Sequence, residues 1–216
     1  MRLGILGWVV LVCMGSLFIP RAAAAQTGFV SGGFQYDIKR YSGDESMNVY
    51  DGEATGGFIG AGTFVSKRLS VEFEAGFSGD TTTTTTTPVA IAGQGTVNFD
   101  TTYTSRMQTY SALVGVHTAP SERLHLSFRG GVTFVHHRRE IVPPPILPVY
   151  AGEPSTSPLP TTIVDNVAGP TAGVDVDVML TPRLAIVGAL RVTQFRIATD
   201  LSAFTIRPLV GVRATF

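Results

Sequence analysis

Charged residues, cysteine and long apolar runs are all scarce in this chain. Only 15% of its residues are charged, against about a quarter in an ordinary soluble domain, although the mean hydropathy is positive at +0.25. The net charge is zero, which gives no indication of a nucleic-acid partner. Beyond residue 25, no apolar run is long enough for a spanning helix. Low charge with 24 glycines therefore favours a protein whose outer face meets lipid and whose backbone hydrogen bonds close in a ring.

The first 25 residues contain the parts of a secretory signal peptide. Arg2 gives a positive start, an apolar stretch covers residues 3–19, and the small residues Ala22–Ala25 follow. We predict cleavage after this alanine run, which leaves residues 26–216 as the mature domain. A transmembrane helix is the alternative, although the stretch is of marginal length for one. The one cysteine, Cys13, lies inside the segment, so the mature domain cannot depend on disulfides.

Apolar and polar residues alternate along most of the mature domain. In residues 69–78, for example, the odd-numbered positions are apolar and the even-numbered positions are mostly polar. Successive side chains of a strand point to opposite faces, so each such segment predicts a strand with one apolar face. We place strands near residues 28–38, 55–66, 69–79, 103–118, 123–137, 166–180, 183–197 and 203–216.

The connections between these predicted strands are of two kinds. Those after the second, fourth and sixth strands are tight turns, and the one after the seventh is also short. Those after the first, third and fifth strands are long and cover residues 39–54, 80–102 and 138–165. Short periplasmic turns opposite long external loops are typical of transmembrane β-barrels. We therefore predict an all-β, antiparallel transmembrane barrel of about eight strands in the bacterial outer membrane, with both termini in the periplasm.

Two alternatives to this architecture stay open. A soluble β-sandwich can also place its long loops at one end. In addition, residues 89–91 and 96–99 can pair as an extra hairpin above the membrane, or they can add two spanning strands and give a ten-stranded barrel. The Thr81–Thr87 run is typical of an exposed segment. Pro170 and Pro208 fall inside predicted strands and each remove one ladder donor, which argues against the strand boundaries there.

The carboxyl terminus carries a more specific signal. The last predicted strand ends in Phe216, and Val210 and Val212 share its face. An alternating final strand with a terminal Phe resembles the targeting signature that the barrel-insertion machinery of bacteria reads. In size and layout the mature domain resembles the small OmpA/OmpX-like outer-membrane barrel family, over essentially all of its length and without a diagnostic local motif. The resemblance implies outer-membrane lipid as the surroundings and that machinery as a partner, and we favour a monomer.

Charged residues occupy inward positions of the predicted strands. An eight-stranded ring leaves an interior just wide enough for side chains, and buried charges must be paired. We expect arginine–carboxylate pairs that form a plugged structural core, with a gated narrow channel, in which the pairs exchange partners, as the alternative. The residues of this predicted charge network are Glu72, Glu74, Arg129, Asp175, Asp177, Arg191, Arg207 and Arg213.

Basic residues also gather near the predicted outer rim. They are candidate contacts to the phosphates of lipopolysaccharide, with a solvated rim as the alternative; the six are Lys39, Arg40, Arg106, Arg138, Arg139 and Arg196. His136 and His137 precede two of them but point to opposite faces of a strand, so they are poor joint metal ligands. No metal or other cofactor is predicted.

His125, Ser127 and Glu140 are the residue types of a hydrolytic triad. The lipid A deacylases are eight-stranded barrels with a His-x-Ser motif, so a lipid A-modifying hydrolase is one interpretation. In those enzymes the motif lies in a late strand and faces the lipid, whereas here it begins the fifth predicted strand and faces inward. Glu140 would lie about 40 Å away, at the other end of the strand. We therefore predict no enzymatic activity.

The sequence thus favours a non-enzymatic outer-membrane barrel that contributes to envelope structure and presents surface loops for contact. A narrow pore or transport channel is the main alternative, and the hydrolase ranks third.

Overall fold

The computed structural model describes residues 28–42, 50–91, 95–118, 121, 123–144, 159–198 and 201–216. The predicted signal peptide and its cleavage site lie outside these residues. The strands are β1 (Gly28–Ser42), β2 (Gly52–Phe64), β3 (Leu69–Ser78), β4 (Thr81–Ile91), β5 (Gly95–Thr118), β6 (Leu124–Val142), β7 (Thr161–Thr181), β8 (Leu184–Ala198) and β9 (Leu201–Thr215). In this part of the chain, no helix has the length and hydropathy needed to cross a membrane.

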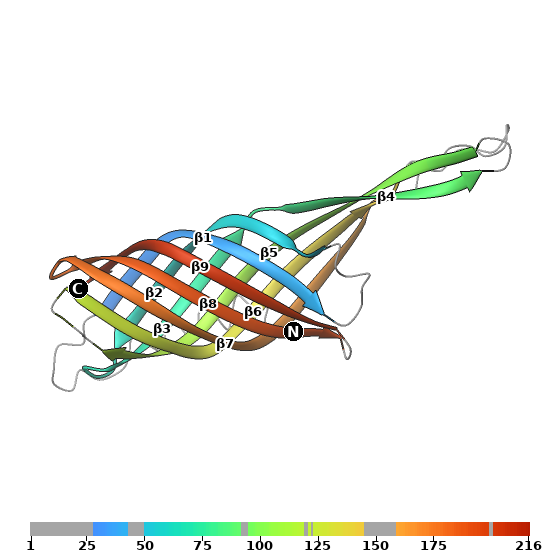
Figure 1. Cartoon of the computed structure of the whole chain (residues 1–216). Coiled ribbons are helices and arrows are strands. Elements are labelled where there is room, and N and C mark those ends of the chain that lie inside the picture. The colour runs from blue at the N-terminus through green and yellow to red at the C-terminus, as the bar shows by residue number, and fades with distance from the viewer. Residues whose placement is uncertain are drawn as a thin grey trace.

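Eight of the strands form a closed antiparallel ring (Figure 1). Hydrogen-bonded neighbours follow the order β3-β2-β1-β9-β8-β7-β6-β5, and β5 then pairs with β3. The first and last strands are adjacent, with Phe29 opposite Thr215. Closure leaves no free strand edge around the ring, which is what a sheet needs in order to span lipid. The predicted barrel of about eight strands is confirmed, and a two-sheet sandwich is excluded.

The strand β4 lies outside the ring and pairs with β5 alone, from Thr81↔Ser105 to Ile91↔Gly95. The extra hairpin that the sequence allowed is therefore present, and the ten-stranded barrel is wrong. The Thr81–Thr87 run, expected as an exposed segment, forms most of β4. A homopolymer shows no alternation, but β-branched threonine suits extended backbone.

The strands β5, β6 and β7 also continue beyond the ring, on the side of the long connections. β7 pairs with β8 only from Thr171↔Thr193 onward, yet it pairs with β6 as far as Thr161↔Ile141. Together with β4, the outer parts of these strands form a four-stranded sheet next to the barrel, and the hairpin of β4 and β5 extends farther out than β6 and β7 do (Figure 1). We call it the protruding sheet. In the orientation that transmembrane barrels share, it lies outside the cell.

Both prolines that argued against the strand boundaries lie where a ladder is interrupted or ends. The β1–β9 ladder skips Tyr36 and Asp37 opposite Arg207 and Pro208, and it then resumes in the same register. Pro170 immediately precedes the first β7–β8 pair. Proline has no N–H to donate, so these are the places where a strand tolerates it. The strands extend through both prolines, as first placed.

Side chains alternate between lumen and outer surface throughout the ring. On β3, Glu72 and Glu74 are buried, whereas Val71, Phe73 and Phe77 are exposed. The lumen is therefore rich in polar groups and the outer surface is apolar, the reverse of a water-soluble protein. This is the distribution expected of a barrel surrounded by lipid.

The seam between β1 and β9 depends on glycine. Gly33 and Gly211 lie opposite each other there. A Cβ at Gly33 would overlap the Val210 carbonyl oxygen, whereas a Cβ at Gly188 on β8 would meet nothing within 4 Å.

We expect Gly33→Ala to lower the free energy of unfolding by about 1–3 kcal/mol, because the added methyl group must push the two backbones of the seam apart. Gly188→Ala is the matched control and should change it little. Urea titration of the refolded variants in the same lipid measures the difference. Equal midpoints for the two variants would contradict close packing at this seam.

Candidate functional site

The charged residues predicted for the lumen all lie in it, and each is 7% exposed or less. They extend from five strands of the ring, namely β3, β6, β7, β8 and β9. The eight are Glu72, Glu74, Arg129, Asp175, Asp177, Arg191, Arg207 and Arg213.

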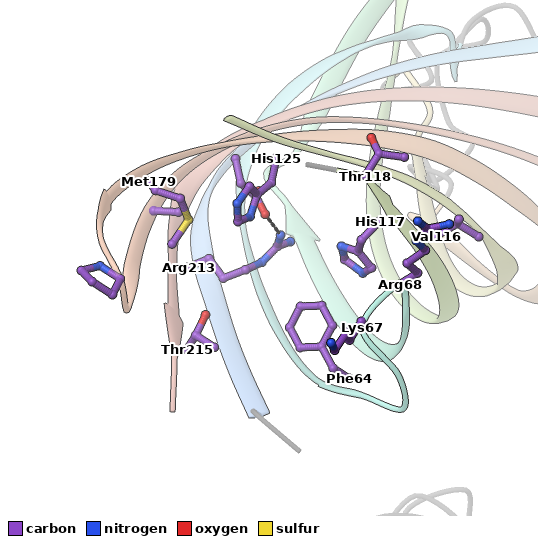
Figure 2. A pocket seen from close by; sticks show the side chains of 13 residues that line it. Phe64, Lys67, Arg68, Val116, His117, Thr118, His125, Met179, Arg213 and Thr215 are labelled. Atoms are coloured by element: carbon purple, nitrogen blue, oxygen red, sulfur yellow. Dashed lines mark hydrogen bonds and ion pairs between the residues drawn. The ribbon is translucent and has the colours of Figure 1, made fainter. Parts of the chain in front are cut away.

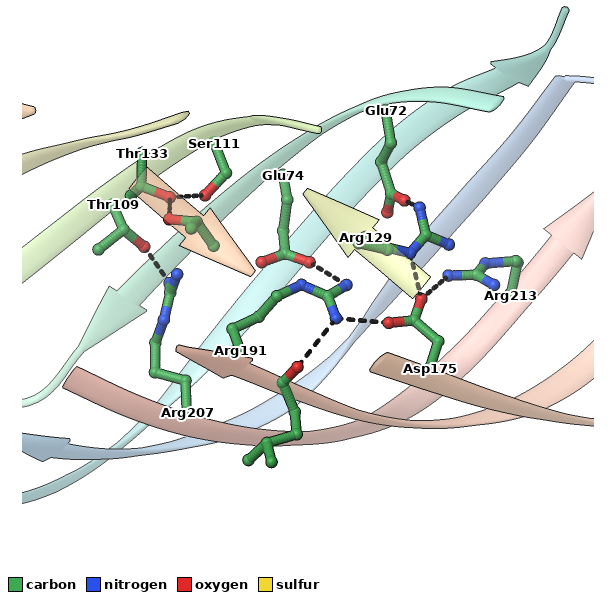
Figure 3. A network of polar contacts seen from close by, with 12 residues as sticks. Glu72, Glu74, Thr109, Ser111, Arg129, Thr133, Asp175, Arg191, Arg207 and Arg213 are labelled. Atoms are coloured by element: carbon green, nitrogen blue, oxygen red, sulfur yellow. Dashed lines mark hydrogen bonds and ion pairs between the residues drawn. The ribbon is translucent and has the colours of Figure 1, made fainter. Parts of the chain in front are cut away.

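Asp175 on β7 is the centre of this group (Figure 3). Its carboxylate accepts hydrogen bonds from Arg129 Nε at 2.6 Å, from Arg213 Nη2 at 2.8 Å and from Arg191 Nη1. The Asp175 side chain is inaccessible to solvent, so the three guanidiniums replace its hydration. One carboxylate therefore ties four strands of the ring together.

Three further carboxylates balance the arginines around Asp175. Each arginine has a second acidic partner: Glu72 for Arg129, Glu74 for Arg191 and Asp177 for Arg213. Charges consequently alternate in sign across the lumen, as burial in a medium of low dielectric requires. We call these seven residues the lumen ion-pair network.

Arg207 lies apart from the network and is the eighth predicted charge. Its Nε is 3.8 Å from Asp37 Oδ1, and its Nη1 donates to Thr109. Asp37 is fully buried and accepts a further hydrogen bond from Gln35 Nε2 at 2.8 Å. The sequence analysis missed Asp37, although it lies in a predicted strand and alternates with the apolar Tyr36 and Ile38.

A row of hydroxyl groups crosses the lumen on the outer side of the network. Ser111, Thr133, Thr171 and Thr193, on consecutive strands β5 to β8, form hydrogen bonds in series with Oγ–Oγ distances of 2.8, 2.5 and 2.8 Å. No motif marks these residues, and only their shared inward register could have found them.

An apolar cluster fills the lumen closer to its outer end. Its buried members are Tyr41, Tyr50, Met107, Val135, Phe195 and Ala203. The Tyr41 ring stacks on the buried His137 ring with 5.9 Å between the ring centroids, and Tyr41 Oη lies 3.1 Å from His137 Nε2. Ion pairs, hydroxyl groups and aromatic rings thus occupy successive layers of the lumen.

Two of the six predicted rim cations belong to this interior. Lys39 is 1% exposed, and its Nζ donates to Ser105 Oγ at 2.7 Å. Arg139 is 7% exposed and pairs with Asp165 at 2.6 Å. The prediction of contacts at the outer surface is therefore wrong for Lys39 and Arg139. Each is the strand neighbour of another predicted rim arginine, and adjacent strand residues cannot share a face.

The remaining predicted rim cations, Arg40, Arg106, Arg138 and Arg196, lie on the outer surface. Arg106 and Arg138 are directly opposite each other on β5 and β6, and they line a cavity of about 300 Å³. Arg106 donates two hydrogen bonds to Asp80, at 2.7 and 2.9 Å, and these lower the pKa of the Asp80 carboxyl.

The residues of the supposed hydrolytic triad are not brought together. Ser127 is 2% exposed and faces the lumen, close to the end with the tight turns. Glu140 lies near the opposite end of β6, across from Thr104 and Thr162. Nor do three His, Cys, Asp or Glu side chains of the described segments gather where they could hold a metal ion.

Comparison with protein families identifies the family to which this barrel belongs. The model of the outer membrane protein β-barrel domain matches residues 9–213, nearly the whole chain. The chain belongs to this outer-membrane β-barrel family. The resemblance drawn from the sequence is confirmed, and with it the location in the bacterial outer membrane.

Solved structures of outer-membrane proteins share this barrel fold at low sequence identity. OprG from Pseudomonas aeruginosa has a TM-score of 0.53 at 10% identity, over 89% of this chain and 96% of that one. A major outer membrane protein from Thermus thermophilus has a TM-score of 0.51 at 14% identity, over 88% of this chain and 99% of that one. Ail of Yersinia pestis has a TM-score of 0.49 at 12% identity, over 88% of this chain and 99% of that one. No curated protein sequence matches the chain.

The last strand of this outer-membrane barrel presents its predicted targeting residues to the outside. Val210, Val212 and Phe216 are 56%, 53% and 71% exposed. The Phe216 N–H donates to the Gly28 carbonyl oxygen at 2.9 Å, which joins the end of the chain to the start of β1.

We expect Asp175→Ala to lower the free energy of unfolding by about 3–5 kcal/mol, because three buried arginines lose their common partner. Asp80→Ala is the matched control, since its ion pair with Arg106 is exposed and contributes about 1 kcal/mol or less. Urea unfolding in lipid vesicles, followed by heat-modifiable gel migration, measures both. Similar losses for the two variants would show that the lumen is hydrated.

Proposed function

We propose that this outer-membrane barrel is a non-enzymatic protein of the envelope, whose filled lumen anchors the protruding sheet at the cell surface for contact. The observation that carries the proposal is the lumen ion-pair network. Its arginines and carboxylates meet across the ring, and the apolar cluster around Tyr41 lies between them and the outer mouth. A lumen occupied by its own side chains suits an anchor better than a passage.

Opening the lumen to a passing solute has a high energetic cost. The side chains of Asp175 and its three arginine partners are all 6% exposed or less. A solute that passed between them would break buried ion pairs, and each uncompensated charge costs about 3–5 kcal/mol. A ring of eight strands has little interior room beyond that of its side chains.

The protruding sheet supports the part of the proposal that concerns contact. Its edges are β4, which pairs only with β5, residues 95–101 of β5, which pair only with β4, and residues 161–170 of β7, which pair only with β6. The unpaired N–H and C=O groups of an edge strand are able to receive a strand from another molecule. Thr82, Thr84 and Thr86 are exposed along the first edge. A polar surface of this kind stays soluble while it offers hydrogen bonds.

A narrow pore is the second candidate, and one observation favours it. Arg207 Nε, Arg207 Nη2 and Gln35 Oε1 are buried and form no hydrogen bond with the described residues. Polar atoms of this kind commonly bind water inside proteins. A continuous column of such water along the lumen would conduct ions.

Planar-bilayer recordings of the refolded protein separate the two candidates. We expect little or no wild-type current, because the ion pairs and the apolar cluster block the lumen. Arg191→Ala tests the lumen, and Arg196→Ala, an outward arginine on the same strand, is the control. Steady wild-type currents whose ion selectivity changes in Arg191→Ala, at an unchanged urea midpoint, would establish the pore instead.

The paired outer arginines support a contact with the phosphates of lipopolysaccharide. Arg106 and Arg138 lie side by side on the outer face of β5 and β6, where a phosphate between them would meet two guanidiniums. Asp80 and Glu140 lie close to the same arginines, so the phosphate competes with carboxylates for them.

Lipopolysaccharide should therefore raise the urea midpoint of the wild-type barrel in phosphatidylcholine bilayers, and the Arg106→Ala/Arg138→Ala variant should lose most of that rise. Arg123→Ala, at a turn on the opposite end, is the control and should keep it. In bilayers without lipopolysaccharide, wild type and double variant should have similar midpoints. A full rise in the double variant would rule these two arginines out as the contact.

The exposed face of Val210, Val212 and Phe216 supports recognition by the barrel-insertion machinery during biogenesis. Cleavage after Ala25 and a monomeric state remain predictions of the same proposal.

A further inference from the structure

A cavity of about 770 Å³ lies at the end of the barrel that carries the tight turns (Figure 2). The proposed function does not use it. One part of its wall is apolar and consists of Phe64, Val116, Met179, Pro182 and Ala185. Another part is basic and consists of Lys67, Arg68, His117, His125 and Arg213. We call this cavity the periplasmic vestibule.

The charge of the vestibule wall is positive. Among the described residues, Asp177 is the one acidic side chain that lines the wall, and it is already paired with Arg213. Lys67 and Arg68 form no ion pair with a carboxylate of the residues that the structure describes. Within that part of the chain, two full positive charges therefore line the cavity without a carboxylate partner.

Arg213 reaches into the vestibule from the barrel side. It is 5% exposed, and its guanidinium lies between the rings of His117 and His125 (Figure 2). Its two terminal nitrogens donate to Asp175 and Asp177, and its Nε is shielded from solvent. Arg213 therefore contributes positive charge to the wall of the vestibule rather than a free hydrogen-bond donor.

The turn that carries Lys67 and Arg68 is held in place by local hydrogen bonds. In the turn between β2 and β3, Val65 N donates to the Leu69 carbonyl oxygen at 2.9 Å. The backbone N–H of His117 donates to the Arg68 carbonyl oxygen at 2.8 Å, and this bond ties the turn to β5. The His117 ring in turn lies 2.7 Å from Ser70 Oγ, through Nε2. The backbone that carries Lys67 and Arg68 is thus fixed beside the cavity.

We propose that the periplasmic vestibule binds the phosphate group of an anionic amphiphile. The phosphate lies against Lys67 and Arg68, because ammonium and guanidinium donors suit its charge and its several acceptor oxygens, and the nearby charge of Arg213 adds to the attraction. The apolar part rests on Phe64 and Met179. The volume of the cavity is in the range of small-molecule sites, about 300–1,000 Å³, and leaves room for more than a free phosphate.

The test uses the refolded full chain in phosphatidylcholine nanodiscs and follows the backbone NMR signals of residues 66–70 and 117. The probes are dihexanoyl phosphatidate, inorganic phosphate and dihexanoyl phosphatidylcholine. We expect saturable shifts with the phosphatidate, weaker shifts with inorganic phosphate and none with the zwitterionic lipid.

Lys67→Gln/Arg68→Gln should weaken phosphatidate binding at least about tenfold, because two charge-assisted hydrogen bonds are lost. Arg183→Gln, at the turn between β7 and β8 and outside the vestibule wall, is the control and should bind as wild type does. Heat-modifiable migration verifies that each variant is folded.

Three results would overturn the proposal. Equal shifts with the zwitterionic lipid would mean that the vestibule takes acyl chains without regard to charge. Equal binding of inorganic phosphate would replace the amphiphile with the free ion. Unchanged affinity in Lys67→Gln/Arg68→Gln would remove the vestibule as the phosphate site.

Discussion

Lipid offers no hydrogen-bond partner, so every backbone group of a membrane-spanning sheet must be paired within the protein. In the present barrel, the ring is closed by two pairings, β1 with β9 and β3 with β5, and they leave no strand of the ring with an unpaired edge. Once the ring is closed with eight strands, alternate side chains must enter a narrow lumen. The polar residues of each strand then have only one another as partners. The layered lumen is a consequence of closure and strand number, and the outer apolar surface follows from the same alternation.

The lumen ion-pair network contributes more to strand register than to net stability. Replacing buried ion pairs by apolar side chains is often neutral or stabilising, because desolvation offsets the attraction between the charges. A slip of β7 by one residue, however, would move Asp175 into lipid and bring Val174 or Val176 into the lumen. The three arginines on β6, β8 and β9 would then lose their common partner. One correctly placed carboxylate thus penalises wrong registers of four strands.

Alternation along the chain predicted all eight strands of the ring and the inward side of the network residues, because a closed sheet imposes a period of two. Where the period was not applied residue by residue, the prediction failed. Lys39 was grouped with Arg40 as a rim cation, although neighbours in a strand face opposite ways. The Thr81–Thr87 part of β4 was not predicted as a strand, because seven identical threonines carry no period. The hydroxyl row of Ser111 and its partners depends on register between strands, which no single strand reveals.

The two ends of the barrel are built differently, and Arg213 joins the inner one to the lumen ion-pair network. Toward the outside, the apolar cluster around Tyr41 fills the lumen beneath the protruding sheet. Toward the tight turns, the vestibule stays hollow and basic. Arg213 belongs both to the vestibule wall and to the network, through Asp177 and Asp175. An anion held there would share this guanidinium with both carboxylates and weaken their hold on it. Asp175 keeps Arg129 and Arg191 in any case, so the network tolerates such sharing without losing its centre.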